Sequence, residues 1–184
     1  MSKRIAYLTA AAFSALAITA TVVAPARAEE KTVMVGGAAM FPSKNIVQNA
    51  VNSKDHTTLV AAVKAAGLVP TLEGKGPFTV FAPTNAAFGK LPAGTVDNLV
   101  KPENKATLTK ILTYHVVPGK LEASDLKDGQ KLKTVEGEEL TVKKSGSSVM
   151  IVDAKGGSST VTIPNVNQSN GVIHVVDTVL MPAS

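Results

Sequence analysis

The side chains that could carry out acid–base, nucleophilic or metal chemistry are few in this chain, which has 184 residues, three His and no Cys. The lack of Cys excludes thiol nucleophiles, disulfides, iron–sulfur clusters and Cys-based zinc sites. His56, His115 and His174 lie far apart, and no two of them have the i, i+4 spacing of a helical metal site. A zinc or iron site would have to assemble from three distant segments. We therefore expect no metal site and no cofactor.

Nucleophilic and carboxylate catalysis also lack a sequence signature. There is no G-x-S-x-G motif, and the Ser- and Gly-rich stretches at 145–148 and 156–159 are typical of turns. Glu136, Glu138 and Glu139 could imitate a glycosidase carboxylate pair, but three acids on a hairpin turn are more typical of a solvated tip. No phosphate-binding or dinucleotide-binding fingerprint occurs, and nothing selects a Ser-His-Asp triad. We predict that the protein is not an enzyme.

The adjacent pair Tyr114 and His115 is the candidate binding site that remains. If the pair is buried, its hydroxyl and ring nitrogens can bond neighbouring backbone groups and hold a helix end against a sheet. A pair buried in this way cannot contact a partner unless the fold opens. We favour this structural role over a binding role.

Two helices and a strand must position this pair. The first helix follows Asp55, a candidate N-cap, and ends at Gly67. Its buried face is predicted to hold Leu59, Ala62, Val63 and Ala66. The second helix begins near Pro102 and leads to the pair, with Leu108, Ile111, Leu112 and His115 on one face. Between them, the apolar run 78–82 predicts a buried strand, and Thr84 can cap a short helix through Phe88.

The second half of the chain changes to short strands separated by turn residues. The predicted strands are 131–135, 139–143, 149–152, 160–163 and 172–176, of which the first two form a hairpin. Helices followed by strands indicate an α+β domain in which helices cover part of a mostly antiparallel sheet. No internal repeat and no interdomain linker is evident.

The N-terminus has the pattern of a secretory signal peptide over residues 1–28. Two positive charges precede an apolar run, and Ala26-Arg27-Ala28 supplies a small-residue cleavage signal. The alternative is an uncleaved membrane anchor, since the apolar run is nearly long enough to span a bilayer, which takes roughly 20 residues. We favour cleavage after Ala28, because the run is rich in Ala and Thr. Residues 29–44 are expected to form a lead-in without regular structure, and residues 45–184 to form one domain.

Removal of the signal peptide changes the charge of the chain. Of the 19 Lys and Arg residues, 16 remain against 14 Asp and Glu, so the net charge falls from +5 to about +2. No basic stripe interleaved with aromatic residues remains, which argues against nucleic acid as a partner. No other segment has the length of a membrane span. The mature chain is expected to be secreted or periplasmic.

Three ordered motifs resemble the fasciclin domain family. They are FTVFAPTNAAF at 78–88, ILTYHVVPGKL at 111–121 and NGVIHVVDTVLMP at 170–182. The resemblance covers roughly residues 45–182 and is closest to the secreted, single-domain bacterial branch. It implies a β-sandwich or wedge of mostly antiparallel strands with a helical layer, and an extracellular adhesion or interaction role.

The resemblance also bears on the candidate site. Animal fasciclin domains have a Tyr-His motif implicated in integrin-dependent adhesion, which corresponds to Tyr114 and His115. Those domains place an Asp-Ile pair ahead of the last strand, where this chain has Asn165-Val166. That departure argues against integrin-type recognition, so only adhesion as a class is carried over.

The hypothesis that follows is an exported protein that mediates adhesion through noncovalent contacts. Its partner would be a cell-surface or matrix protein or a glycan. One domain of modest charge would bind weakly, so adhesion would need multivalent display. The alternative is a periplasmic or secreted carrier that binds a small apolar or glycan ligand between the helical layer and the sheet.

Overall fold

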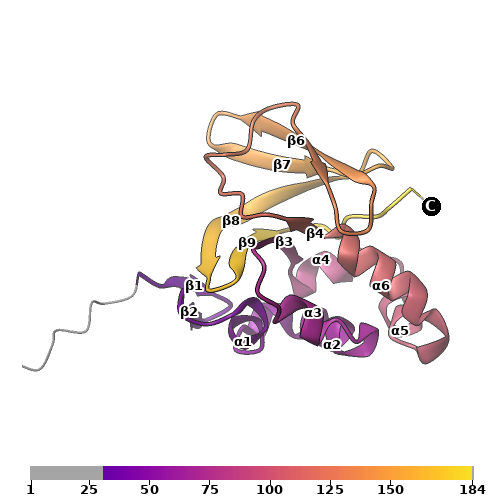
Figure 1. The fold of residues 1–184 in the computed structure, drawn as a ribbon. Coiled ribbons are helices and arrows are strands. Elements are labelled where there is room, and N and C mark those ends of the chain that lie inside the picture. Colours follow the sequence, from indigo (N-terminus) through magenta and orange to yellow (C-terminus); the bar gives the residue numbers. More distant parts are fainter. Residues whose placement is uncertain (1–30, 184) are drawn as a thin grey trace, which may run out of the picture.

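A strongly curled sheet of seven strands forms the upper half of the molecule in Figure 1, a computed structural model that describes residues 31–183. The predicted signal peptide and its cleavage site lie outside the described residues. The strand order is β4-β3-β9-β8-β7-β6-β5. The strands are β3 (Phe78–Pro83), β4 (Val116–Pro118), β5 (Lys131–Lys133), β6 (Glu139–Ser145), β7 (Ser148–Val152), β8 (Ser158–Gln168) and β9 (Gly171–Val176). All neighbours pair antiparallel except β3 and β9, which are parallel.

The sheet curls until its two edges nearly meet. Beyond the end of β5, the amide of Val135 donates a hydrogen bond of 2.8 Å to the carbonyl of Val116 in β4. The long strand β8 makes this possible, because its first residues pair with β7 and its later residues pair with β9. Its pairing with β9 is broken by two register shifts, which bend the strand. The result is almost a barrel.

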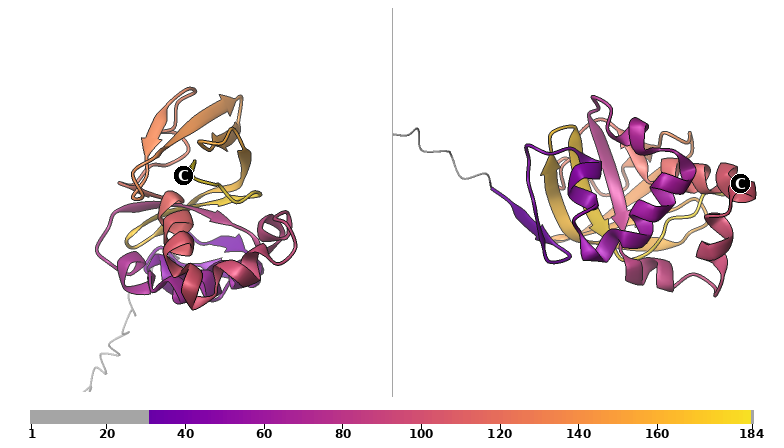
Figure 2. Two further views of the ribbon diagram at one scale, coloured as in Figure 1. Left: turned by 90° about the vertical axis from the view of Figure 1, so that its right-hand side faces the viewer. Right: turned by 90° about the horizontal axis from the view of Figure 1, so that it is seen from below.

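The helices gather on one side of the sheet, below it in Figure 1 and in front of it in the right-hand view of Figure 2. They are α1 (Ile46–Ala50), α2 (Thr57–Ala66), α3 (Val69–Leu72), α4 (Asn85–Gly89), α5 (Thr95–Leu99) and α6 (Lys105–Tyr114), with the 3₁₀ turns η1 (Lys54–His56) and η2 (Pro102–Asn104). The predicted α+β class is thereby confirmed, with a helical layer against a mostly antiparallel sheet.

Helix α2 buries the predicted face of Leu59, Ala62, Val63 and Ala66, and it ends at Gly67 in the left-handed conformation. The predicted N-cap is wrong. Asp55 lies in η1, and the side chain of Asn85 accepts a hydrogen bond of 3.0 Å from the amide of Thr58 instead. The side-chain amide nitrogen of Asn85 also donates a hydrogen bond of 2.8 Å to the carbonyl of Lys54. A side chain from a distant motif therefore caps this helix.

Strand β3 separates two apolar cores because its side chains alternate between its faces. Val80 and Ala82 belong to a core against the helices, whereas Phe81 belongs to a core inside the curled sheet. The inner core also contains Tyr114, Val117, Leu126, Leu132, Leu140, Val142, Val149, Ile151, Val176 and Leu180. The same central strand thus supports both halves of the molecule.

The lead-in is more ordered than the sequence suggested. Val33–Val35 (β1) and Ala38–Met40 (β2) form an antiparallel hairpin, and Val35 and Met40 are buried in the core against the helices. Gly36 and Gly37 link the two strands, and both have positive φ (57° and 76°). Such a pair is suited to the two-residue turn of a hairpin. The expectation of no regular structure before residue 45 is therefore wrong.

Among residues 31–183, no helix has the length and apolar character needed to cross a membrane.

Candidate functional site

His115 ends α6 and is buried between the helices and the sheet. Its Nδ1 donates a hydrogen bond of 2.8 Å to the carbonyl of Ile111, one turn earlier in α6. Its Nε2 accepts one of 3.0 Å from the amide of Leu180, near the end of the chain. One nitrogen must carry a proton and the other must not, so the ring is neutral. Burial favours the same state and lowers the pKa of His115 to about 4, although the Ile111 carbonyl and Asp153 oppose the shift.

Tyr114 points to the other side, into the core inside the curled sheet, and has no exposed surface. Its hydroxyl accepts a hydrogen bond of 2.8 Å from the amide of Ala154 and donates one of 3.4 Å to the carbonyl of Glu139. Burial raises the pKa of this hydroxyl. The adjacent residues of the candidate pair are thus separated by the sheet, and every polar atom of their side chains has a backbone partner.

The position that departs from the animal motif, Asn165-Val166, is also fixed by contacts within the fold. Asn165 has a φ of 57° at the bend of β8, and its side-chain oxygen accepts a hydrogen bond of 2.8 Å from the amide of Ala123. The backbone amide of Asn165 donates a hydrogen bond of 3.3 Å to Nδ1 of the buried His174. Nε2 of His174 in turn donates one of 2.8 Å to the carbonyl of Leu121. Val166 is buried. The side chains of this segment fix the bend of β8.

The three acids near the β5–β6 turn do not converge. Glu136 pairs with Lys110 at 3.5 Å, and Glu139 pairs with Lys131 at 3.3 Å. Glu138 accepts a hydrogen bond of 2.8 Å from the amide of Ala183. Glu136 and Glu138 are half-buried, so the expected solvated tip is only partly correct. In the described part of the chain, no group of three or more His, Asp or Glu side chains could hold a metal ion.

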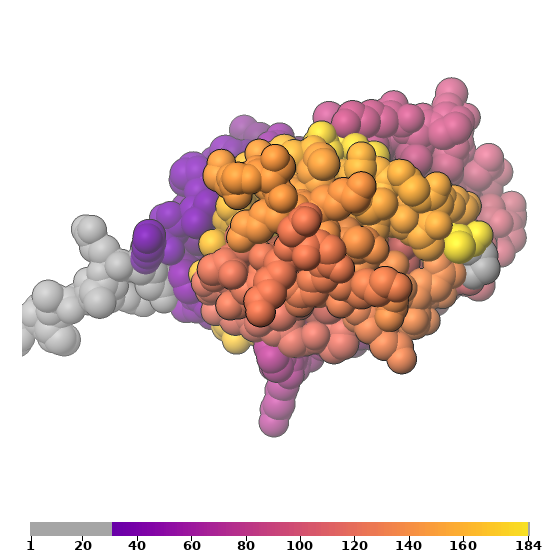
Figure 3. All heavy atoms as spheres, turned by 90° about the horizontal axis from the view of Figure 1, so that it is seen from above, coloured from indigo at the N-terminus to yellow at the C-terminus, as the bar shows by residue number. Residues whose placement is uncertain are grey.

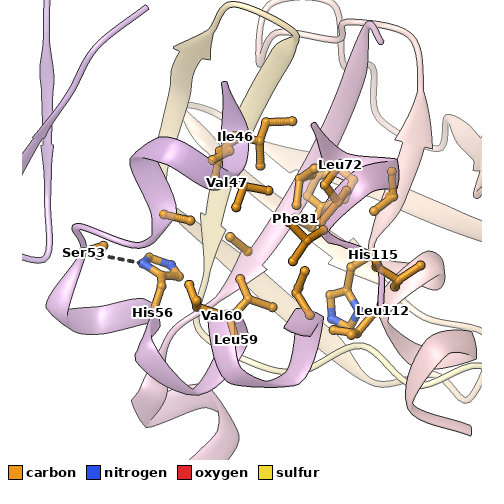
Figure 4. A pocket seen from close by; sticks show the side chains of 18 of the residues that line it. Ile46, Val47, Ser53, His56, Leu59, Val60, Leu72, Phe81, Leu112 and His115 are labelled. Atoms are coloured by element: carbon orange, nitrogen blue, oxygen red, sulfur yellow. Dashed lines mark hydrogen bonds between the residues drawn. The ribbon is translucent and has the colours of Figure 1, made fainter. Parts of the chain in front are cut away.

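A cavity lies between the helices and the sheet, where the carrier hypothesis places its ligand. It has a volume of about 60 Å³. Figure 4 shows His56 and His115 on opposite sides of it, with mostly aliphatic side chains and Phe81 between them. Its floor comes from the sheet, through Val80, Val116 and Ile173. The sequence alone could not give the size or the lining of this cavity, because a void depends on how distant segments pack.

His56 is the polar residue at one wall of this cavity. Its Nδ1 shares a hydrogen bond of 2.9 Å with the hydroxyl of Ser53. Its buried Nε2 makes no hydrogen bond of normal geometry with the described residues, although the nearby Ala82 carbonyl favours the protonated ring. Burial outweighs that carbonyl and lowers the pKa of His56, so the cavity wall is uncharged here.

The opposite end of the molecule offers a different kind of surface. Figure 3 shows the face over β6, β7 and β8 as rounded, without a deep hollow. Exposed side chains alternate with buried ones along β6 and β7. A partner that binds this face would meet a broad surface of the sheet.

The fold defines the class of protein: a small α+β domain with a nearly closed sheet, in which the three motifs converge. The first motif contains β3, the second leads through α6 into β4, and the third contains β9, so the motifs supply three adjacent strands. The family model of the fasciclin domain matches residues 54–182. The chain therefore belongs to the fasciclin family.

Known proteins similar to this chain support the assignment. Protein sll1483 of Synechocystis sp. is 46% identical over 179 residues, which cover 97% of this chain and 96% of that protein. The immunogenic protein MPB70 of Mycobacterium bovis is 40% identical over 138 residues, which cover 72% of this chain and 66% of that protein. A domain pair of the insect cell adhesion molecule fasciclin I has the same fold, with a TM-score of 0.68 at 19% identity over 77% of this chain and 52% of that one.

Proposed function

We propose that this protein is exported and mediates attachment at the cell surface or in the surrounding matrix through noncovalent contacts. The observation that carries the proposal is the relationship to a named cell-surface protein. The cell surface glycolipoprotein MPB83 of Mycobacterium bovis is 39% identical over 153 residues, which cover 80% of this chain and 64% of that protein. The proposed partner is a cell-surface or matrix protein or a glycan, and the proposed role is not enzymatic.

The proposed contact surface excludes the side chains of Tyr114 and His115. Both are buried, and their polar atoms already bond backbone groups. A partner that used them would have to break those bonds and open the core, at a cost of about 1 to 3 kcal/mol for each buried group left unpaired. The rounded face over β6–β8 needs no such opening. Weak contacts at this face would gain strength from display of many copies.

The test is the binding of bead-coupled protein to whole source cells and to matrix-coated surfaces. We expect fold-dependent binding that rises steeply with the number of copies per bead, because several weak contacts then act together. Heat-unfolded protein on the same beads is the control for nonspecific adsorption. Binding no better than this control at the highest bead density would contradict the proposal.

A variant separates the proposed surface from the buried pair. Tyr114→Phe removes the hydroxyl but keeps the ring that fills the inner core. We expect beads that carry the folded variant to bind as well as beads that carry the unchanged protein. Loss of binding by a variant that remains folded would assign the contact to Tyr114 instead.

Within the carrier hypothesis, the cavity favours an apolar ligand over a glycan. Its walls are almost entirely aliphatic, and the polar groups of His115 at its edge are already bonded. A glycan would have to give up most of its hydrogen bonds to water, with Nε2 of His56 as the one unpaired polar atom described at the wall, which is costly. An apolar ligand makes no hydrogen bonds to water, so it loses none when it enters the cavity.

A further inference from the structure

We propose that the cavity between the helices and the sheet binds the hydrocarbon tail of a small amphiphile with an acidic head group. The inference goes beyond the adhesion role, because it concerns a different part of the molecule and a ligand of a different class. It rests on the composition of the cavity, its mouth, its size and the charge at its rim.

The interior of the cavity suits hydrocarbon. Its walls are formed by buried aliphatic side chains from both layers, including Leu59, Val63, Leu72, Val80 and Ile173. An apolar cavity of this kind disfavours water, because water needs two to four polar partners and the wall offers few apart from Nε2 of His56. Hydrocarbon that enters it gains dispersion contacts and loses only its contact with water.

The mouth of the cavity lies among the three short helices α1, α2 and α3. The lining residues that keep some exposure all come from this region, whereas those from the sheet are buried. The half-exposed ones are Val47, Ala50, Val60, Leu68 and Val69. A ligand therefore enters from the helical side, between aliphatic side chains that already face solvent.

The size of the cavity decides how much of the ligand it holds. Its volume of about 60 Å³ is less than half of the roughly 150 Å³ of an engineered cavity that holds benzene. Only the end of a chain fits, so the rest of the ligand must lie at the mouth. The bound molecule needs an apolar end and can carry a polar one.

The rim charge selects the head group. Lys64, an exposed residue of α2, is the one Lys, Arg, Asp or Glu among the cavity-lining residues that the structure describes. No ion pair involving Lys64 is found within residues 31–183. Both lining histidines have lowered pKa values and are neutral at pH 7. The rim is thus positive with no competing carboxylate, which favours an anion such as the carboxylate of a fatty acid.

The experiment compares three probes with the same tail and different heads: octanoate, 1-octanol and octylamine. Binding to the full chain is measured at low salt by calorimetry and by the NMR shifts of methyl groups that line the cavity, such as those of Val60. We expect octanoate to bind most tightly and octylamine least, with the shifts confined to cavity methyls. Shortening the carboxylate tail should weaken binding by about fourfold per methylene once the tail no longer fills the cavity.

Two variants test the rim and the mouth separately. Lys64→Glu should weaken octanoate binding by about fivefold and strengthen octylamine binding, because exposed charge pairs contribute up to about 1 kcal/mol. Lys101→Glu makes the same charge change at an exposed lysine that does not line the cavity, and it should leave both affinities nearly unchanged. Ala50→Phe places a large ring at the mouth and should abolish binding while the protein stays folded.

Each departure from this pattern overturns the proposal. No binding of any probe would show that the cavity is only a packing defect. If octanol bound as tightly as octanoate, the proposed preference for an acidic head group would be wrong. Equal effects of the two lysine variants would contradict it as well. Octanoate binding that survives Ala50→Phe would place the ligand elsewhere. If Ala50→Phe abolishes bead adhesion and leaves octanoate binding intact, the mouth serves a macromolecular partner instead.

Discussion

His115 connects two parts of the chain through the two nitrogens of one neutral ring. The carbonyl of Ile111 receives the proton of Nδ1, and the amide of Leu180 donates to Nε2. Protonation of Nε2 would break the second bond and leave a charge in an apolar environment. The ring therefore stabilises the fold only while it is neutral.

This state makes stability depend on pH. The pKa of His115 is about 4 in the folded protein and near 6.5 when unfolded, so the unfolded chain binds the proton first as the pH falls. Its contribution is fully present above pH 6.5 and is lost by about pH 4, which amounts to about 3 kcal/mol. We expect urea unfolding to give about 2 kcal/mol less stability at pH 5 than at pH 7.5 from this residue alone. The lowered pKa values of His56 and His174 act in the same direction.

His115→Asn isolates the contribution of this ring. The variant should be about 1 to 3 kcal/mol less stable at pH 7.5, because packing and at least one buried hydrogen bond are lost. Its stability should also fall less between pH 7.5 and pH 5. Parallel pH curves for the variant and the unchanged protein would show that His115 is not the residue that titrates.

Single residues also show where sequence reasoning reaches its limit. The buried face of α2 and the cap at Thr84 were predictable, since both depend on residues within one or two turns of each other. The partner of His115 was not, because Leu180 lies 65 residues away in sequence. The cap of α2 by Asn85, from 27 residues away, is not predictable for the same reason. Contacts between distant segments depend on the assembled fold.

Among the elements, the β1–β2 hairpin arises from a local signal that fits two interpretations. Gly36-Gly37 lies between two short runs of apolar residues, which is a recognised pattern for a two-residue hairpin turn. Glycine is also common in irregular loops, so the same pair is compatible with a segment that has no regular structure. The hairpin then covers one side of the helical core with Val35 and Met40, so it contributes to the domain rather than preceding it.

Neighbouring residues of β1 provide a matched test of this contribution. Val35 is 4% exposed and Met34 is 60% exposed, so they face opposite sides of one strand. We expect Val35→Ala to lower the free energy of unfolding by about 2 kcal/mol and Met34→Ala to change it by less than about 0.5 kcal/mol. Urea unfolding of both variants measures the difference. Two equal, small effects would mean that the hairpin is not part of the folded domain.

At the scale of the whole molecule, the two apolar cores share the central strand β3. Val80 and Ala82 contact the helical side, and Phe81 contacts the inner side of the sheet. If β3 separates from the sheet, both cores lose side chains that they need for packing. The general architecture was predictable from the order of helices and strands, whereas the curling of the sheet was not, because it depends on the bends in β8 and on the meeting of β4 and β5.

The shared strand predicts one cooperative unfolding transition. Leu108→Ala removes side-chain volume from the helical core and Leu140→Ala from the inner core, and each should cost about 2 to 5 kcal/mol. Helical circular dichroism and the fluorescence of Tyr114, the single tyrosine of residues 31–183, should give the same midpoint in each variant. A helical signal lost before the tyrosine signal would show that the layers unfold independently.

The parallel pairing of β3 with β9 also governs the order in which the protein can fold. Phe78 lies opposite Gly171, so the two central strands are separated by about ninety residues, and contacts over such distances form slowly. During synthesis, β3 lacks this neighbour until almost the entire domain has been made. The segment that contains β9 thus determines when the native state first becomes accessible, so a nascent chain remains unfolded for a long interval, as the proposed export across a membrane would require.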